Sequence, residues 1–179
     1  MINLEYLLNE KYGDYSYGCI MVKVDEASSR LLFEFGTKII DDNILYTDET
    51  QKDSFGREKD MHVTVKYGLT QSYTKEQMKH LLKNVVPFNI QVKGISVFEN
   101  ERFDVVKFDI DGKELRALNE LFSKLPNQDS HPKYKPHLTL GYVHKGMGKR
   151  FIKPVSKFAT IPVKILEYSD RGEKTYYNL

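Results

Sequence analysis

The chain of 179 residues contains one cysteine, Cys19, no tryptophan and no long hydrophobic run. A single cysteine excludes an internal disulfide framework and a cysteine-rich zinc site. No segment approaches the roughly 18 consecutive apolar residues of a membrane-spanning helix. The first residues also lack the basic and apolar regions of a secretory signal. We therefore expect a soluble, cytoplasmic globular protein with no membrane partner.

The net charge of +2 excludes both a strongly acidic chain and a histone-like basic one. The charge is nevertheless unevenly distributed. Residues 41–60 contain seven acidic residues against three basic ones, whereas residues 131–179 contain ten basic residues against three acidic ones. The basic C-terminal quarter favours an anionic ligand such as a phosphate, with an ordinary solvated face as the alternative.

Hydrophobic periodicity predicts strands and helices in an order typical of an α+β fold with mainly antiparallel sheets. Asp25 and the pair Thr74 and Gln77 are typical helix N-caps, and Asp111 with Glu114 predicts a third. The apolar phase slips by one residue at Lys93-Gly94, which predicts a β-bulge. Strands are expected in 15–25, 61–67, 88–97, 106–110, 136–143, 161–168 and 175–177.

No stretch rich in proline, glycine or serine divides the chain, so we expect one domain over residues 1–179. The acidic stretch 41–60 has no sustained period and is predicted to be a long loop. Loops of that length inside a domain are often functional lids, although a plain mobile insertion fits equally well.

Two predicted strands carry the same pattern, His62-Val63-Thr64 and His137-Leu138-Thr139. Because residues i and i+2 of a strand point to one face, each strand presents an imidazole and a hydroxyl together, while apolar neighbours hold the other face. A single match of this length is more often a half-buried histidine beside a strand threonine. Two matches in similar strand contexts favour a functional pair.

Two imidazoles can divide general acid and general base catalysis near neutral pH, since histidine titrates there. Two hydroxyls on the same faces can donate hydrogen bonds to phosphate oxygens. Such a set can cleave a phosphodiester without a metal or cofactor. Zinc ligation by His131, His137 and His144 is the alternative, but their spacing matches no usual ligand pattern.

With its paired His62-x-Thr64 and His137-x-Thr139 motifs, the sequence resembles the two-histidine (2H) phosphoesterase superfamily. That group includes LigT-like RNA 2′,3′-cyclic phosphodiesterases, eukaryotic cyclic phosphodiesterases and viral members that destroy nucleotide messengers. The resemblance implies a two-lobed, pseudo-symmetric α+β fold with the motifs facing a shared cleft and the lobes interleaved along the chain. It also implies metal-independent catalysis by His62 and His137, with Thr64 and Thr139 holding the phosphate.

Five further residues are weaker candidates for substrate binding. Lys66 follows Thr64 by two positions, and Lys133 and Lys135 precede His137, so each could contact a phosphate. Tyr17 and Tyr176 could stack on a nucleobase. Structural roles are the alternative for all five. Tyr142 is expected to pack, Cys19 to be a small core residue, and His80 to be a solvated helix residue.

The resemblance leaves three hypotheses for function. The first is hydrolysis of cyclic oligonucleotide or 2′–5′ oligoadenylate immune signals, in the host cytoplasm if the source is viral. The second is a phosphodiesterase that acts on RNA 2′,3′-cyclic phosphate ends. The third, from another class, is a nucleotide- or RNA-binding module without turnover. All three need a nucleotide or oligonucleotide partner, and none requires an obligate protein partner.

Overall fold

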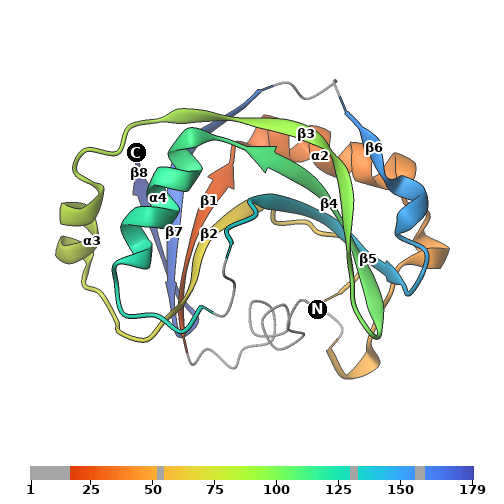
Figure 1. The fold of residues 1–179 in the computed structure, drawn as a ribbon, viewed down its shortest axis with the longest axis horizontal. Coiled ribbons are helices and arrows are strands. Elements are labelled where there is room, and N and C mark those ends of the chain that lie inside the picture. Colours follow the sequence, from red (N-terminus) through yellow and green to blue (C-terminus); the bar gives the residue numbers. More distant parts are fainter. Residues whose placement is uncertain (1–16, 52–54, 130–132, 156–159) are drawn as a thin grey trace.

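The computed structural model describes residues 17–51, 55–129, 133–155 and 160–179 (Figure 1). The elements of regular structure are three helices, eight strands and three short 3₁₀ turns among these residues, and their order confirms the predicted α+β class. The strands are β1 (Gly18–Val24), β2 (His62–Leu69), β3 (Phe88–Glu99), β4 (Phe103–Asp111), β5 (His137–His144), β6 (Lys153–Pro154), β7 (Ile161–Asp170) and β8 (Glu173–Asn178). The helices are α2 (Glu26–Ile39), α3 (Lys75–Leu82) and α4 (Lys113–Ser123), with turns η1 (Asp42–Ile44), η2 (Glu49–Gln51) and η3 (Lys149–Phe151).

The strands form one antiparallel sheet in the order β2-β1-β7-β3-β4-β5, with β8 added beside β7 and β6 beside β3. We call β2, β1, β7 and β8 lobe 1, and β5, β4, β3 and β6 lobe 2. The lobes join where the first residues of β3 pair with β7. The strands of each lobe therefore follow an equivalent order, which gives the predicted pseudo-symmetry.

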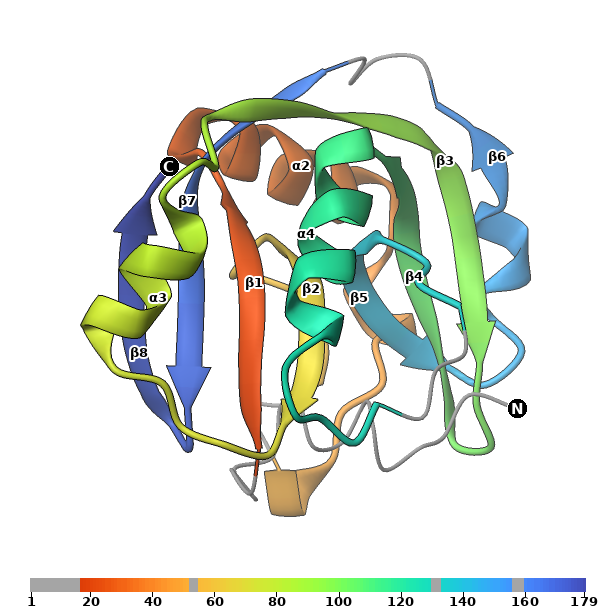
Figure 2. The same ribbon diagram turned by 60° about the vertical axis from the view of Figure 1, so that its left-hand side comes forward.

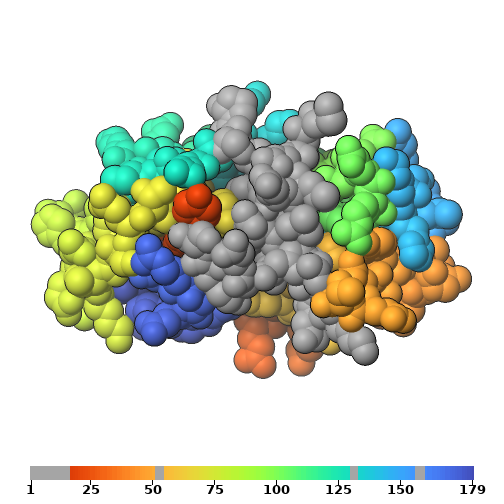
Figure 3. Space-filling model, turned by 90° about the horizontal axis from the view of Figure 1, so that it is seen from below, coloured from red at the N-terminus to blue at the C-terminus, as the bar shows by residue number. Residues whose placement is uncertain are grey.

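The sheet curves so strongly that its two outermost strands, β2 and β5, contact each other in the middle of the molecule (Figure 1). Seen from below, lobe 1 lies on one side and lobe 2 on the other (Figure 3). The curvature follows the long strand β3, whose register with β4 shifts between Val92 and Gly94. This shift confirms the bulge predicted at Lys93-Gly94, because a bulge bends its strand and increases the local twist.

The helices cover the lobes crosswise. The chain forms α2 between β1 and β2 of lobe 1, yet α2 packs on β5 of lobe 2. The chain forms α4 between the lobe 2 strands β4 and β5, yet α4 packs on β2 (Figure 2). The main hydrophobic core therefore runs between the helices and both lobes, and the opposite face of β2 and β5 is left for polar side chains.

The helix caps are as predicted in two of three cases. Asp25 accepts the Ser28 N–H at 3.1 Å at the start of α2, and Thr74 and Gln77 form a reciprocal capping box on α3. The prediction for the third helix was wrong, because Gly112 and not Asp111 is its N-cap.

The described residues of the acidic stretch 41–60 form a loop with the short turns η1 and η2, as predicted for a loop, and backbone hydrogen bonds join them to β5. The Tyr46 N–H donates to Tyr142, the Tyr142 N–H to Gly56, and the Glu58 N–H to Leu140, at 2.8 to 3.0 Å. Since β5 would otherwise expose an unpaired edge, this stretch stabilises the motif strand by satisfying its backbone groups. Tyr142 is buried in the small aromatic cluster that results, which confirms its predicted packing role.

Candidate functional site

Both His-x-Thr motifs begin their strands. His62 is the first residue of β2 and His137 the first of β5. Their apolar neighbours, such as Val63 and Leu138, are fully buried in the main core. The alternation of a strand then turns the histidines and threonines to the opposite face. His62, His137 and Thr139 are half-buried, whereas Thr64 is only 8% exposed.

A bulge follows the threonine in each motif. Thr64 pairs with Met21 and Lys66 with Ile20, so Val65 is the extra residue in β2. In β5, Thr139 pairs with Lys107 and Gly141 with Val106, so Leu140 is the extra residue. Bulges re-aim side chains and break the alternation that follows them. In each motif the alternation thus holds for the first three residues, so the histidine and the threonine share one face and the apolar residue between them points to the core.

The two imidazoles are held by the same hydrogen bond. Nδ1 of His62 lies 2.6 Å from the carbonyl oxygen of Asp60, and Nδ1 of His137 lies 2.9 Å from that of Lys135. Since a carbonyl oxygen only accepts, Nδ1 carries a proton in both rings. Each histidine therefore has Nε2 available to accept or donate the proton of a reaction.

The surroundings of the His137 ring disfavour its charged form. Burial lowers the pKa of His137 to about 4, and the positive charges of Lys107 and His62 act in the same direction. The hydrogen bond to Lys135 and the charge of Asp109 oppose this shift without cancelling it. His137 is therefore a neutral imidazole at pH 7, with a free lone pair on Nε2. The two strands that these histidines begin, β2 and β5, contact each other.

Lys107 and Asp109 flank His137 and were not predicted as site residues. In the β4–β5 register, Asp109 lies opposite His137 and Lys107 opposite Thr139. Lys107 Nζ lies 2.6 Å from Asp109 Oδ1 and 2.6 Å from Ser96 Oγ. The available signal was the alternation of β4, in which both charged residues fall on the face away from the main core.

Around His62 lies a second charged cluster that the sequence analysis missed. Lys23, opposite His62 on β1, forms an ion pair with Asp60 and lies 3.5 Å from Glu167. Lys174 lies 3.2 Å from Glu167, whose side chain is completely buried. Burial alone would raise the pKa of Asp60, but the hydrogen bond and charge of Lys23 lower it. Asp60 therefore stays ionised next to His62, whose Nδ1–H donates to the Asp60 carbonyl oxygen.

Lys66 and Tyr17, two of the weaker candidates, lie against the segment that follows α4. Lys66 Nζ pairs with Asp129 at 2.8 Å and is mostly buried. The Tyr17 hydroxyl donates to Gln128 at 2.7 Å, and its ring packs edge-on against Tyr67. Both side chains thus have structural contacts. Because Val65 is an extra residue in β2, strand alternation no longer places Lys66 on the same face as Thr64.

The other three candidates, Lys133, Lys135 and Tyr176, have exposed side chains. Lys133 and Lys135 are exposed just before β5, and the Lys135 carbonyl is the one that orients His137. Tyr176 is 57% exposed on β8, where it lies opposite Glu167. Of the two tyrosines, Tyr176 therefore has the ring that remains available to a ligand.

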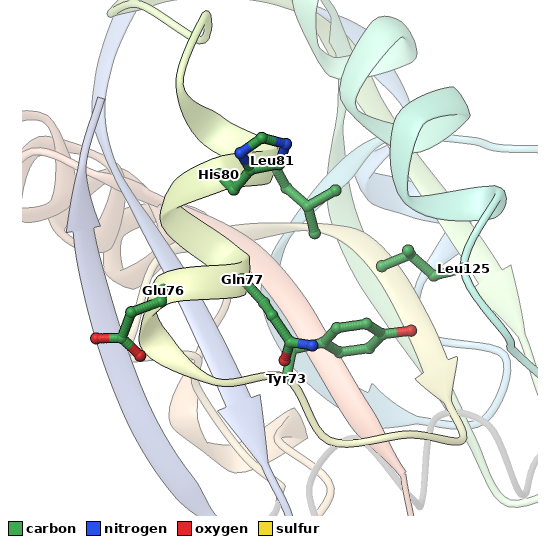
Figure 4. Close-up of a pocket in the computed structure, with 6 residues that line it drawn as sticks. All are labelled: Tyr73, Glu76, Gln77, His80, Leu81 and Leu125. Atoms are coloured by element: carbon green, nitrogen blue, oxygen red, sulfur yellow. The ribbon is translucent and has the colours of Figure 1, made fainter.

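Other sites in the described structure offer less chemistry. A shallow pocket of about 450 Å³ lies between α3 and the end of the α4 segment (Figure 4). Its lining includes the exposed His80 but no residue of either motif. No three histidine, cysteine, aspartate or glutamate side chains gather as metal ligands among the described residues. Within the same residues, no helix is long and apolar enough to cross a membrane.

A family model described as the 2′-5′ RNA ligase superfamily matches residues 47–156, a range that includes both motifs. No curated protein matches the sequence of the chain.

Several solved structures share the fold. Usb1 from Kluyveromyces marxianus is 10% identical with a TM-score of 0.60, and covers 92% of this chain and 99% of its own. LigT from E. coli in its apo form is 13% identical with a TM-score of 0.59, over 92% and 94% of the two chains. TT0787 from Thermus thermophilus is 19% identical with a TM-score of 0.55, over 91% and 94%. At these identities the likeness establishes the two-lobed fold, and the site's chemistry must come from its own residues.

Proposed function

The chain belongs to the 2′-5′ RNA ligase superfamily of two-histidine phosphoesterases, and from this premise we propose that His62, Thr64, His137 and Thr139 form one active site for metal-independent phosphodiester cleavage. The matched pair of imidazoles carries this proposal. Each begins an outermost strand of a curved sheet, each is held through Nδ1 by the carbonyl two residues earlier, and the two strands contact each other. A lone structural histidine would not need an equivalent partner in the other lobe.

In the proposed reaction, a water molecule or the substrate's own 2′-hydroxyl attacks phosphorus, and the bond from phosphorus to the leaving oxygen breaks. His137, which is neutral at pH 7, accepts the proton of the attacking oxygen on Nε2. His62, protonated on both ring nitrogens at the start of the step, donates the Nε2 proton to the leaving oxygen, which departs as an alcohol. Solvent then takes the added proton from His137 and returns one to His62. The Thr64 and Thr139 hydroxyls donate hydrogen bonds to the non-bridging phosphate oxygens.

We propose a cyclic oligonucleotide or a 2′–5′ oligoadenylate as the substrate, and the 2′-5′ linkage in the family's description supports this choice. An RNA end with a 2′,3′-cyclic phosphate is the second candidate. It is favoured by E. coli LigT, which has been solved with phosphate and with 3′-AMP. Tyr176 would stack on a base, and Lys133 and Lys135 would contact flanking phosphates.

A mass-spectrometric cleavage assay in EDTA tests the function. The protein is incubated with cyclic di- and trinucleotides, 2′–5′ oligoadenylate and nucleoside 2′,3′-cyclic phosphates. We expect turnover of at least one class, lost in His62→Ala and in His137→Ala but kept in the control His80→Ala. The class that is consumed decides the substrate.

Turnover that survives both motif substitutions, or that needs a metal ion, would overturn the proposal. Nucleotide binding without turnover across the panel would instead support the binding module.

A further inference from the structure

Lys107 is unusual because it is a charged residue that is almost completely buried beside the proposed active site. It is only 3% exposed on β4. Lysine is rarely buried unless its ammonium group is paired, since removing the charge from water is costly. Here Nζ contacts Ser96 Oγ and Asp109 Oδ1 and lies 4.1 Å from the centre of the Phe98 ring. The buried ammonium group of Lys107 therefore has three specific contacts that hold it in place.

These partners connect Lys107 to His137. The Phe98 ring that receives the ammonium on its face also packs edge-on against the imidazole, with 4.9 Å between ring centres. Asp109, whose Oδ1 accepts from Lys107 and Ser96, lies opposite His137 in the strand register. Lys107 therefore contacts both the Phe98 ring, which packs on His137, and the carboxylate of Asp109, which lies opposite His137.

We infer that Lys107 is a positioning residue for the proposed reaction: by engaging Asp109 and the Phe98 ring, it keeps the His137 imidazole neutral and fixed in orientation, so that His137 accepts the first proton. This inference rests on the proposed function for its place in the reaction. Its physical content, the effect of Lys107 on His137, can be measured without a substrate.

Burial is the largest cause of the low pKa of His137, and the charges that face the ring modify it. Lys107 and Asp109 lie on β4, Lys135 lies on the approach to β5, and His62 lies on β2. Asp109 alone would favour an imidazolium, as carboxylates beside histidine do. Because Lys107 occupies that carboxylate and adds its own positive charge, the balance disfavours protonation of His137. Burial of the ring acts in the same direction and lowers its pKa to about 4.

The test follows the His137 ring signal by NMR from pH 3 to 8 without substrate, assigned by its loss in His137→Asn. In Lys107→Met, Asp109 is released toward the ring, and we expect the pKa of His137 to rise by at least about one unit. The double variant Lys107→Met/Asp109→Asn should lose most of that rise. Lys107→Arg keeps the charge and should keep the low value.

Asp109→Asn alone removes the carboxylate that favours the imidazolium and should lower the pKa of His137 further. This variant tests the inference even if Lys107→Met does not fold. A His137 titration that is the same in wild type, Lys107→Met and Asp109→Asn would overturn it. Where a substrate has been found, the acid limb of kcat/KM should move with the NMR value. If the titration shifts but no substrate is cleaved, the effect of Lys107 stands and the proposed function fails.

Discussion

Around His62 the neighbouring charges are balanced, with Lys23 and Lys174 against Asp60 and Glu167. Around His137 they are mainly positive, since Lys107 and His62 outnumber Asp109. The backbone treats the two rings alike, because both donate from Nδ1 to the carbonyl two residues earlier. Thus the repeated strand geometry sets the tautomer of both rings, while burial and the charge of Lys107 lower the pKa of His137.

This comparison teaches that a pseudo-symmetric pair need not be symmetric in chemistry. An acid and a base are needed in the same turnover, and two rings in equivalent surroundings would compete for one protonation state. In the proposed reaction, the low pKa of His137 assigns the role of base to this ring and leaves that of acid to His62.

The largest expected effect distinguishes the two histidines by the leaving group. With an ordinary oligonucleotide, His62→Ala and His137→Ala should each lower kcat by about a thousandfold, within the usual range for general acid–base catalysis. A nucleoside 3′-p-nitrophenyl phosphate releases a stable anion that needs no proton. On this ester His62→Ala should lose only about tenfold, whereas His137→Ala should still lose about a thousandfold.

Release of p-nitrophenolate, followed by absorbance, gives the rates, and His80→Ala serves as the control on both substrates. If the ester rescues His137→Ala and not His62→Ala, the acid and base roles are reversed. If it rescues neither or both, the division of roles is wrong.

The second prediction compares the buried charges by stability. Glu167 is completely buried between Lys23 and Lys174, so Glu167→Gln should lower the free energy of unfolding by about 3 kcal/mol, because two cations then lose a buried partner. The Asp109 side chain is about half exposed, and in Asp109→Asn the buried Lys107 keeps its contacts with Ser96 Oγ and the Phe98 ring. Asp109→Asn should therefore cost less than Glu167→Gln, about 1–2 kcal/mol.

Urea denaturation of both variants provides the measurement, with equal m-values as the check on two-state unfolding. Equal losses of unfolding free energy would show that the pairing of Glu167 with Lys23 and Lys174 stabilises the fold no more than the pairing of Asp109 with Lys107.

The features that could be predicted from the sequence are those with a local period. The His-x-Thr strands, the bulge at Lys93-Gly94 and the capping box of Thr74 and Gln77 each depend on residues within a few positions. The α+β class followed from the same patterns.

The charged clusters could not be predicted, because their members come from different strands. Lys107 meets Ser96, and Lys23 meets Glu167, only once the register is set. The predicted alternation also broke down at the bulges, since one extra residue changes the phase. The pairing of 41–60 with β5 had no periodic signal at all, because irregular backbone can satisfy a strand edge without a pattern in its side chains.

The smallest expected effect concerns the helices that cover the two lobes. Asp25 caps α2, which packs on β5, so Asp25→Ala should lower the free energy of unfolding by about 1 kcal/mol. Asp111→Ala is the matched control at α4. Its carboxylate is exposed and precedes the N-cap Gly112, so we expect a loss below about 0.5 kcal/mol.

The contribution of Asp25 to the free energy of unfolding should also depend on pH. Burial alone would raise the pKa of Asp25, but its hydrogen bonds at the cap, chiefly those with Ser28, bring it below the ordinary value of 3.8. A carboxyl whose pKa is lower in the folded state stabilises above its unfolded pKa and loses that effect as the pH falls. The difference between wild type and Asp25→Ala in urea denaturation should therefore be full at pH 7 and shrink below pH 3.8. A difference that stays constant down to pH 2 would mean that the carboxylate is not what stabilises α2 over β5.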